Sequence, residues 1–238
     1  MKALWIRKSF SFSPIRSRPS TPILISIEGN IGAGKTTLLN ALRQCAAANP
    51  SFVFIDEPIS LWETIKNERN ESLLEVFYND RRRWSYTFQN AAILTRFQSI
   101  QAAQKSSSRG KGEVFVTERC LQTDFNVFTK MLVAEKSIDK LEYELYLRWY
   151  YHLLNESAVK LSGIVFVATD PHTCHERIQF RGRKGEEKEL LSLNYLESLD
   201  KFQRSWINKN EVPALFTTTE GASAVISFVE GIVSTASN

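Results

Sequence analysis

Short apolar runs alternate with longer segments of helical periodicity along most of the chain. Five runs are of strand length and rich in β-branched and aromatic residues: residues 23–28, 52–56, 114–117, 164–168 and 214–217. Runs that are apolar throughout and separated by helices are typical of a parallel sheet covered on both faces. The pattern therefore predicts a three-layer α/β domain around a five-stranded parallel sheet.

Two segments between the strands carry further predictions. Residues 73–104 have the periodicity of one long helix. The polar residues 105–112 (KSSSRGKG) are expected to form the loop ahead of the third strand. Together with the strands, these segments indicate one domain over residues 22–238, preceded by a tail.

The composition excludes several classes of protein. With 238 residues, 43% of them hydrophobic and 24% charged, the chain resembles soluble globular proteins. Because no run approaches the roughly 18 to 20 apolar residues of a membrane span, no membrane contact is expected. Three cysteines do not make a secreted disulfide scaffold. An intracellular compartment fits best.

The excess of positive charge comes from the N-terminal segment. The net charge is +4, but residues 1–27 contain five basic residues and no acidic ones, which leaves 25 basic against 26 acidic residues elsewhere. This balance gives no sign of nucleic-acid binding. Residues 1–21 are rich in Ser and Arg, as in transit peptides, but equally fit a flexible solvated tail. The protein is thus expected in the cytoplasm, or in the mitochondrion if the tail is a transit peptide.

A phosphate-binding motif directly follows the first predicted strand. Its residues are Gly29, Asn30, Ile31, Gly32, Ala33, Gly34, Lys35, Thr36 and Thr37. They match G-x-x-x-x-G-K-[ST] in the required context, between a strand and a helix. The glycines let backbone N–H groups close around phosphate oxygens, Lys35 can reach the β- and γ-phosphates, and Thr36 can hold Mg²⁺. The motif predicts binding of ATP or another nucleoside triphosphate.

Charged residues follow the second and third predicted strands. Glu57 comes after the second strand, Glu118 and Arg119 end the third, and Asp124 follows shortly afterwards. Ligands of open α/β sheets gather at these carboxyl ends. A carboxylate there could accept a proton from a hydroxyl group or hold Mg²⁺, and Arg119 could neutralise a transferring phosphoryl group.

Two helical segments add polar side chains. Tyr78, Gln89, Ala92 and Arg96 are spaced to share one face of the predicted long helix, which suits a polar planar ligand better than a core. Past the fourth strand, the arginines are Arg177, Arg181 and Arg183. Arg177 and Arg181 share a helix face, and glycines beyond them allow a bend. This segment is therefore expected to act as an arginine-rich lid over the triphosphate.

Together these motifs resemble the deoxynucleoside kinase family over about residues 23–216. The residues that carry the resemblance are 27–37, 57–58, 62, 83–89, 118–119, 176–178 and 181–183. The resemblance implies transfer of the γ-phosphate of ATP, or of another nucleoside triphosphate, to the 5′-hydroxyl of a 2′-deoxynucleoside with Mg²⁺. It also implies a homodimer.

The resemblance assigns roles to individual residues. Glu57 would be the general base on the 5′-hydroxyl, Glu118 would assist Mg²⁺, and Arg119 would lie against the 5′-oxygen. Tyr78 would hold the 3′-hydroxyl together with Glu187, or with Glu186, because the sequence has an extra residue ahead of this acidic pair.

The base would be framed and read by Trp62, Gln89, Ala92, Arg96, Asp124 and Phe128. Within the family, Ala92, Arg96 and Asp124 resemble the branch that acts on deoxycytidine, deoxyadenosine and deoxyguanosine. An Arg–Asp pair presents a donor and an acceptor to a base edge, whereas the methyl group of thymine favours an apolar wall. The preferred substrate is thus expected to be deoxycytidine or a deoxypurine nucleoside.

Two other functions remain open on the sequence. A kinase of nucleoside monophosphates or of another small acceptor would share the phosphate-binding motif and the lid, but would bind the acceptor phosphate with arginines. A non-catalytic nucleotide-binding module would bind ATP without releasing ADP in response to a nucleoside.

Overall fold

The structure contains one parallel sheet of five strands. It is a computed structural model that describes residues 22–46, 51–106, 113–182 and 191–236. The strands are β1 (Ile23–Glu28), β2 (Phe52–Ile55), β3 (Val114–Glu118), β4 (Lys160–Val167) and β5 (Ala214–Thr217). Their order in the sheet is β2-β3-β1-β4-β5, and every pairing is parallel. The predicted five-stranded parallel sheet is confirmed.

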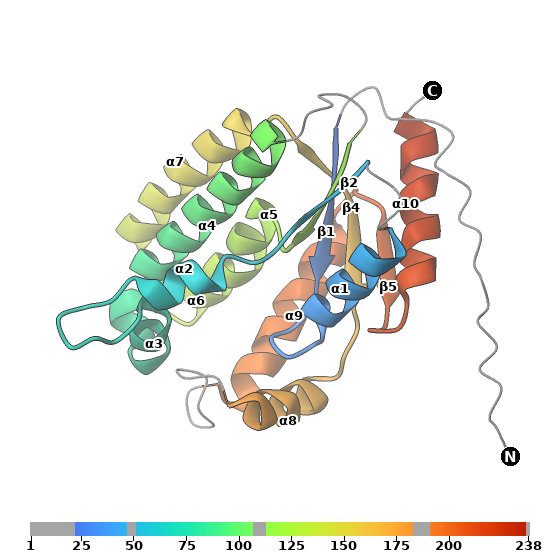
Figure 1. Ribbon diagram of the computed structural model, residues 1–238. Helices are drawn as coiled ribbons and strands as arrows, with labels where there is room; N and C mark the ends of the chain where they lie inside the picture. The colour runs from blue at the N-terminus through green and yellow to red at the C-terminus, as the bar shows by residue number, and fades with distance from the viewer. Residues whose placement is uncertain (1–21, 47–50, 107–112, 183–190, 237–238) are drawn as a thin grey trace, which may run out of the picture.

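The helices are α1 (Lys35–Cys45), α2 (Ile59–Thr64), α3 (Leu73–Asn79), α4 (Arg81–Ser106), α5 (Leu121–Thr123), the π-helical η1 (Asp124–Thr129), α6 (Lys130–Ala134), α7 (Lys140–Glu156), α8 (Pro171–Arg181), α9 (Leu193–Lys209) and α10 (Ala222–Ala236). Helices α1 and α10 pack together on one face of the sheet, and α4 and α9 lie toward the other, with α7 packed against α4 (Figure 1). None of the helices within the described residues is long and apolar enough to cross a membrane.

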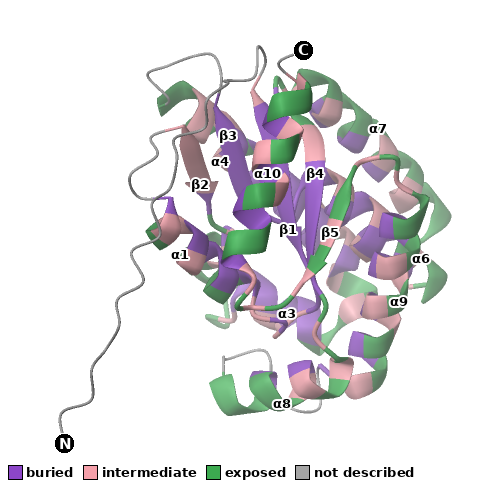
Figure 2. Cartoon of the chain, turned by 90° about the vertical axis from the view of Figure 1, so that its right-hand side faces the viewer, coloured by how far each residue is buried: buried purple, intermediate pink, exposed green. Residues whose placement is uncertain are grey.

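The sheet is buried between these layers. Every residue of β1 and β3 is buried, as is the second half of β4 (Figure 2). Strand β4 begins at Lys160, four residues before the apolar run that predicted it. The apolar pattern missed these first residues because they are exposed or half-buried and include polar side chains. Apart from the start of β4, the predicted bounds of all five strands lie within one residue of the observed ones, including those of the partly exposed β5.

The predicted single helix over residues 73–104 is wrong. It is interrupted at Asp80, whose backbone leaves the helical region and whose Oδ1 accepts a hydrogen bond from the backbone N–H of Arg83 at 3.1 Å. This side-chain cap begins a second helix. Tyr78 therefore lies on α3, whereas Gln89, Ala92 and Arg96 lie on α4.

The predicted loop at 105–112 is wrong at its first two residues. Helix α4 continues through Ser106, and residues 107–112 lie outside the described residues, as does the N-terminal segment 1–21.

Candidate active site

The phosphate loop joins β1 to α1. Gly32 has φ +78°, and a Cβ at this position would stand 2.6 Å from the backbone oxygen of Cys174 in α8. Only glycine fits this close approach. Lys35 begins α1, and its Nζ donates a hydrogen bond to the backbone oxygen of Asn30 at 2.8 Å. The loop thus has the shape and the helix N-terminus of an anion site.

Lys35 and Thr36 both face Glu118 at the end of β3. The Thr36 hydroxyl donates a hydrogen bond to Glu118 Oε2 at 2.8 Å, and Lys35 Nζ lies 3.6 Å from Glu118 Oε1. Burial, reinforced by the positive charge of Arg119, lowers the pKa of Lys35 to about 8. The predicted metal-binding pair, Thr36 and Glu118, is therefore brought together beside the phosphate loop.

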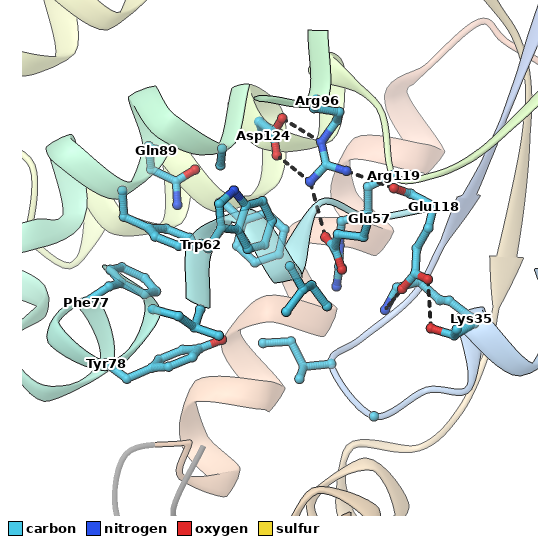
Figure 3. A pocket seen from close by; sticks show the side chains of 18 of the residues that line it. Lys35, Glu57, Trp62, Phe77, Tyr78, Gln89, Arg96, Glu118, Arg119 and Asp124 are labelled. Carbon is cyan, nitrogen blue, oxygen red and sulfur yellow. Dashed lines mark hydrogen bonds and ion pairs between the residues drawn. The ribbon is translucent and has the colours of Figure 1, made fainter. Parts of the chain in front are cut away.

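The buried Arg96, Arg119 and Asp124 form a network with the partly buried Glu57 near the ends of β2 and β3. Arg119 Nη1 contacts both carboxylate oxygens of Glu57, at 2.8 and 2.9 Å. Arg96 Nη2 lies 3.2 Å from Glu57, and Arg96 Nε donates to Asp124 Oδ2 at 2.9 Å (Figure 3). Arg96 Nη1 also binds the backbone oxygen of Glu118 at 2.8 Å. The side chains of α4, of η1 and of the segments that follow β2 and β3 therefore hold one another in place.

The network controls the charge of Glu57. Burial by itself raises the pKa of this carboxyl group, but the guanidinium groups of Arg119 and Arg96 outweigh it and hold the pKa at about 2. Burial raises the pKa of Asp124, which faces a single close arginine. Glu57 is therefore ionised at neutral pH and can accept a hydrogen bond.

A cavity opens between this network and the phosphate loop. Aromatic rings from α2, α3 and α4 form its apolar wall, Trp62 and Phe77 among them (Figure 3). Phe77 is stacked on Phe88, and Trp62 meets Phe88 edge-on. The Trp62 indole N–H is fixed by Thr95 Oγ1 at 3.0 Å. A cavity that combines an aromatic wall with convergent polar groups is typical of small-molecule sites.

Nearly every predicted substrate residue lines this cavity. Those that do are Glu57, Trp62, Tyr78, Gln89, Ala92, Arg96, Arg119, Asp124 and Phe128. Glu186 and Glu187 lie outside the described residues. Although Tyr78 is on a different helix from Gln89, the packing of α3 against α4 brings both to the same cavity.

A second hollow covers the phosphate loop and α8. It is lined by Gly32, Gly34, Lys35, Thr36, Thr37, Glu118, Arg177, Arg181 and Thr219. The residues that it shares with the cavity are Gly32, Lys35, Thr36, Glu118 and Arg181. Arg177 Nη1 lies 3.2 Å from the backbone oxygen of Ala33. Helix α8 ends at Gly182, whose φ is +59°, and Arg183 lies outside the described residues. Two of the three arginines predicted to form the lid thus border the phosphate loop.

The comparison with known proteins agrees with this arrangement. A model of the deoxynucleoside kinase family matches residues 25–231. The chain belongs to this family. It is accordingly a deoxynucleoside kinase of nucleotide salvage with ATP as phosphate donor, the activity that the resemblance implied with ATP or another nucleoside triphosphate as donor.

Three relatives illustrate the similarity of this kinase to known enzymes. The chain is 31% identical to the mitochondrial deoxyguanosine kinase of Xenopus laevis, covering 87% of this chain and 81% of the relative. It is 33% identical to deoxycytidine kinase 2 of Gallus gallus, covering 80% of each. It is also 31% identical to the deoxycytidine kinase of Homo sapiens, covering 77% of this chain and 74% of the relative.

Sequence reasoning missed several residues that line the two hollows of the kinase. They are Ile59, Leu74, Phe77, Phe88, Tyr195 and Thr219. The apolar ones have the same pattern as core residues, so periodicity alone could not single them out. Tyr195 lies in the first turn of α9, is buried, and has a hydroxyl without a hydrogen-bond partner among the described residues.

Proposed function

We propose that the kinase transfers the γ-phosphate of ATP to the 5′-hydroxyl of a deoxynucleoside bound in the cavity. The observation that carries this proposal is the Glu57 carboxylate, which stands where the cavity meets the phosphate loop. The buried guanidinium groups of Arg96 and Arg119 are both paired with carboxylates. This pairing favours an uncharged hydroxyl acceptor over the phosphorylated acceptor of a nucleoside monophosphate kinase.

Glu57 acts as the general base in this proposal. An ionised carboxylate accepts a hydrogen bond from the 5′-hydroxyl and takes its proton as the new P–O bond forms. With a pKa of about 2, Glu57 is a weak base while both arginines face it. Negative charge on a triphosphate held by Lys35 opposes these arginines and raises the proton affinity of Glu57. Arg119, already at Glu57, then stabilises charge at the 5′-oxygen.

Thr36 and Glu118 fit a magnesium ion bound with the donor. They offer a hydroxyl and a buried carboxylate beside the phosphate loop, with 2.8 Å between Thr36 Oγ1 and Glu118 Oε2. Oxygen ligands of this kind are those that Mg²⁺ prefers, usually with substrate phosphates completing its coordination. The ion would neutralise phosphate charge, and Thr36 and Glu118 would hold it.

Arg177 and Arg181 are proposed to contact the transferring phosphoryl group. Both border the hollow over the phosphate loop, and they come from one helix that packs against that loop. Forked guanidinium groups match phosphate oxygens and stabilise the charge of the transition state. For Arg183, the same role rests on the family resemblance alone.

Arg96 and Asp124 are proposed to read the base, with Gln89 beside them, and to favour deoxycytidine or a deoxypurine nucleoside. The paired Arg96 and Asp124 present donors and acceptors to a base edge in the apolar cavity. The names of the relatives, deoxycytidine and deoxyguanosine kinases, support this preference. Tyr78 is proposed to hold the 3′-hydroxyl with Glu186 or Glu187.

Turnover of Mg·ATP with each of the four natural deoxynucleosides tests the proposed function. We expect a 5′-monophosphate product and ADP release that depends on the nucleoside, with thymidine the poorest acceptor. ADP release with deoxynucleoside monophosphates alone would instead identify a monophosphate kinase, and ATP binding without ADP release would identify a non-catalytic module.

Affinity for ATP should fall as the pH rises above about 8. Lys35 must be protonated to bind phosphate, and its pKa in the free kinase is about 8, well below the usual value of a lysine. The dissociation constant should therefore rise by up to about tenfold per pH unit above that value. Calorimetric titration of Mg·ATP between about pH 7 and about pH 9.5 measures it. A flat dissociation constant would contradict the assignment of Lys35.

We also propose that the kinase forms a homodimer through the outer faces of α4 and α7. Leu141, Leu145 and Trp149 follow one another at four-residue spacing on α7 and are 70%, 43% and 55% exposed, with Leu94 of the adjoining α4 46% exposed. A contiguous apolar face of this kind is typical of an interface.

Trp149→Glu should convert the dimer into a monomer, because it places a charge in the apolar interface. Sedimentation velocity measures the change, and Ile65→Glu, which alters an exposed apolar residue elsewhere, should leave the dimer intact. A wild-type monomer, or a Trp149→Glu dimer, would exclude this interface.

We propose that residues 1–21 determine whether the kinase is located in the cytoplasm or in the mitochondrion. The basic residues 1–21 either remain a solvated tail of a cytoplasmic enzyme or direct it to the mitochondrion, and the name of the Xenopus laevis relative supports the second location.

A further inference from the structure

A buried carboxyl group lies behind Arg119. Glu28 ends β1 and is fully buried, and it is not among the described residues that line the cavity. Its Oε1 accepts hydrogen bonds from the hydroxyl groups of Ser26 and Thr123, and Cys120 Sγ lies 3.7 Å away. A single carboxyl group therefore ties β1 to the turn that follows β3.

This turn holds an unfavourable backbone conformation. Arg119 has φ +63°, in the left-handed region that a residue with a Cβ rarely adopts. Such a conformation persists where surrounding contacts fix the backbone on both sides. On one side, the Arg119 N–H donates to the backbone oxygen of Ile27 at 3.1 Å. On the other, the Cys120 N–H donates to Thr123 Oγ1 at 3.2 Å. The same Thr123 hydroxyl donates a hydrogen bond to Glu28. The Glu28 carboxyl group therefore holds Thr123 and, through it, the backbone at Cys120.

The backbone at Arg119 decides where its guanidinium group lies. Its Nη1 binds Glu57 at 2.8 Å and its Nη2 lies 3.3 Å from the backbone oxygen of Gly29. A rotation of the turn would move the long Arg119 side chain away from both partners.

Burial raises the pKa of the Glu28 carboxyl group and so favours its neutral form. The neutral form keeps one oxygen free to accept the hydrogen bonds from the Ser26 and Thr123 hydroxyl groups.

We propose that Glu28 is a positioning residue for phosphoryl transfer, which through Thr123 fixes the left-handed backbone at Arg119 and keeps its guanidinium group on Glu57. This inference rests on the proposed function, because Arg119 matters only if Glu57 meets the acceptor hydroxyl. Glu28 itself touches neither substrate in this arrangement.

Thr123→Val tests the link, because it removes the hydroxyl and keeps the volume. We expect kcat to fall by about 10- to 100-fold while KM for ATP changes less than about twofold. Thr123→Ser keeps the hydroxyl donor and Glu28→Gln keeps the oxygen acceptor. Each of these single variants should therefore have a kcat within about threefold of the wild type. Wild-type kcat in Thr123→Val would overturn the proposal.

A double-mutant cycle with Arg119→Ala separates positioning from general stability. If Thr123 acts through Arg119, Thr123→Val should have almost no further effect on kcat in the Arg119→Ala background. The same fold-loss in both backgrounds would overturn the proposal.

If Thr123→Val does not fold, as judged by thermal unfolding, Ser26→Ala takes its place, because it removes the other hydroxyl bound to Glu28. Its loss of kcat should likewise disappear in the Arg119→Ala background. A wild-type enzyme that phosphorylates no deoxynucleoside would instead refute the proposed function, which distinguishes the two failures.

Discussion

Glu57→Gln should reduce kcat by about 10²- to 10⁴-fold, the range that general bases supply. The amide keeps the size of the side chain but cannot take the proton of the 5′-hydroxyl. Because Glu57 does not line the hollow over the phosphate loop, the affinity for Mg·ATP should stay within about threefold of the wild type. Turnover with a saturating deoxynucleoside and calorimetric titration of Mg·ATP measure the two quantities.

Asp56→Asn is the matched control for this experiment. Asp56 is the preceding residue, but its side chain is exposed and pairs with Arg43 on the surface at 3.0 Å. An exposed pair of this kind contributes little, so activity should be unchanged. Turnover of Glu57→Gln within about twofold of the wild type would remove Glu57 from the role of base.

Arg96→Met combined with Asp124→Ala should shift the substrate preference toward thymidine. The two changes remove the buried pair that is proposed to read the base and leave an apolar wall. A site built to bind polar base edges loses its intended substrate when those partners are removed, and an apolar wall accepts the thymine methyl group. We expect the ratio of kcat/KM for deoxycytidine to that for thymidine to fall by about 100-fold or more.

The ratio is the informative quantity, since Arg96 also contacts Glu57 at 3.2 Å and its loss will lower turnover with every nucleoside. Arg43→Met with Asp56→Ala removes an exposed Arg–Asp pair and serves as the control. An unaltered ranking of the four deoxynucleosides in the Arg96→Met and Asp124→Ala variant would contradict the assignment of this pair to base reading.

The sheet could be predicted from the sequence because its central strands are buried on both faces. Strand β1 matches its apolar run residue for residue, and β3 differs only by Glu118. The break at Asp80 could not be predicted from apolar periodicity, which continues from α3 into α4. Its signal was the polar pair Asn79-Asp80, since Asp is a preferred residue at the start of a helix. The π-helix at Asp124–Thr129 depends on tertiary packing and has no comparable local signal.

The charged residues of the candidate site could be predicted because they follow strands whose carboxyl ends must meet at one edge of a parallel sheet. The aromatic wall could not, because Phe77 and Phe88 have the pattern of ordinary core residues and meet only when α3 packs on α4. Glu28 lies in the segment 27–37 that carries the family resemblance, but its contact with Thr123 spans 95 residues of sequence and requires the fold.

A structure of the kinase with ADP and its best deoxynucleoside substrate tests the central claim most directly. We predict a Glu57 carboxylate oxygen within about 3 Å of the 5′-oxygen, with the base between Trp62 and Phe128 and its edge toward Arg96. A 5′-oxygen that points away from Glu57, with the 5′ end of the acceptor held by arginines, would contradict it.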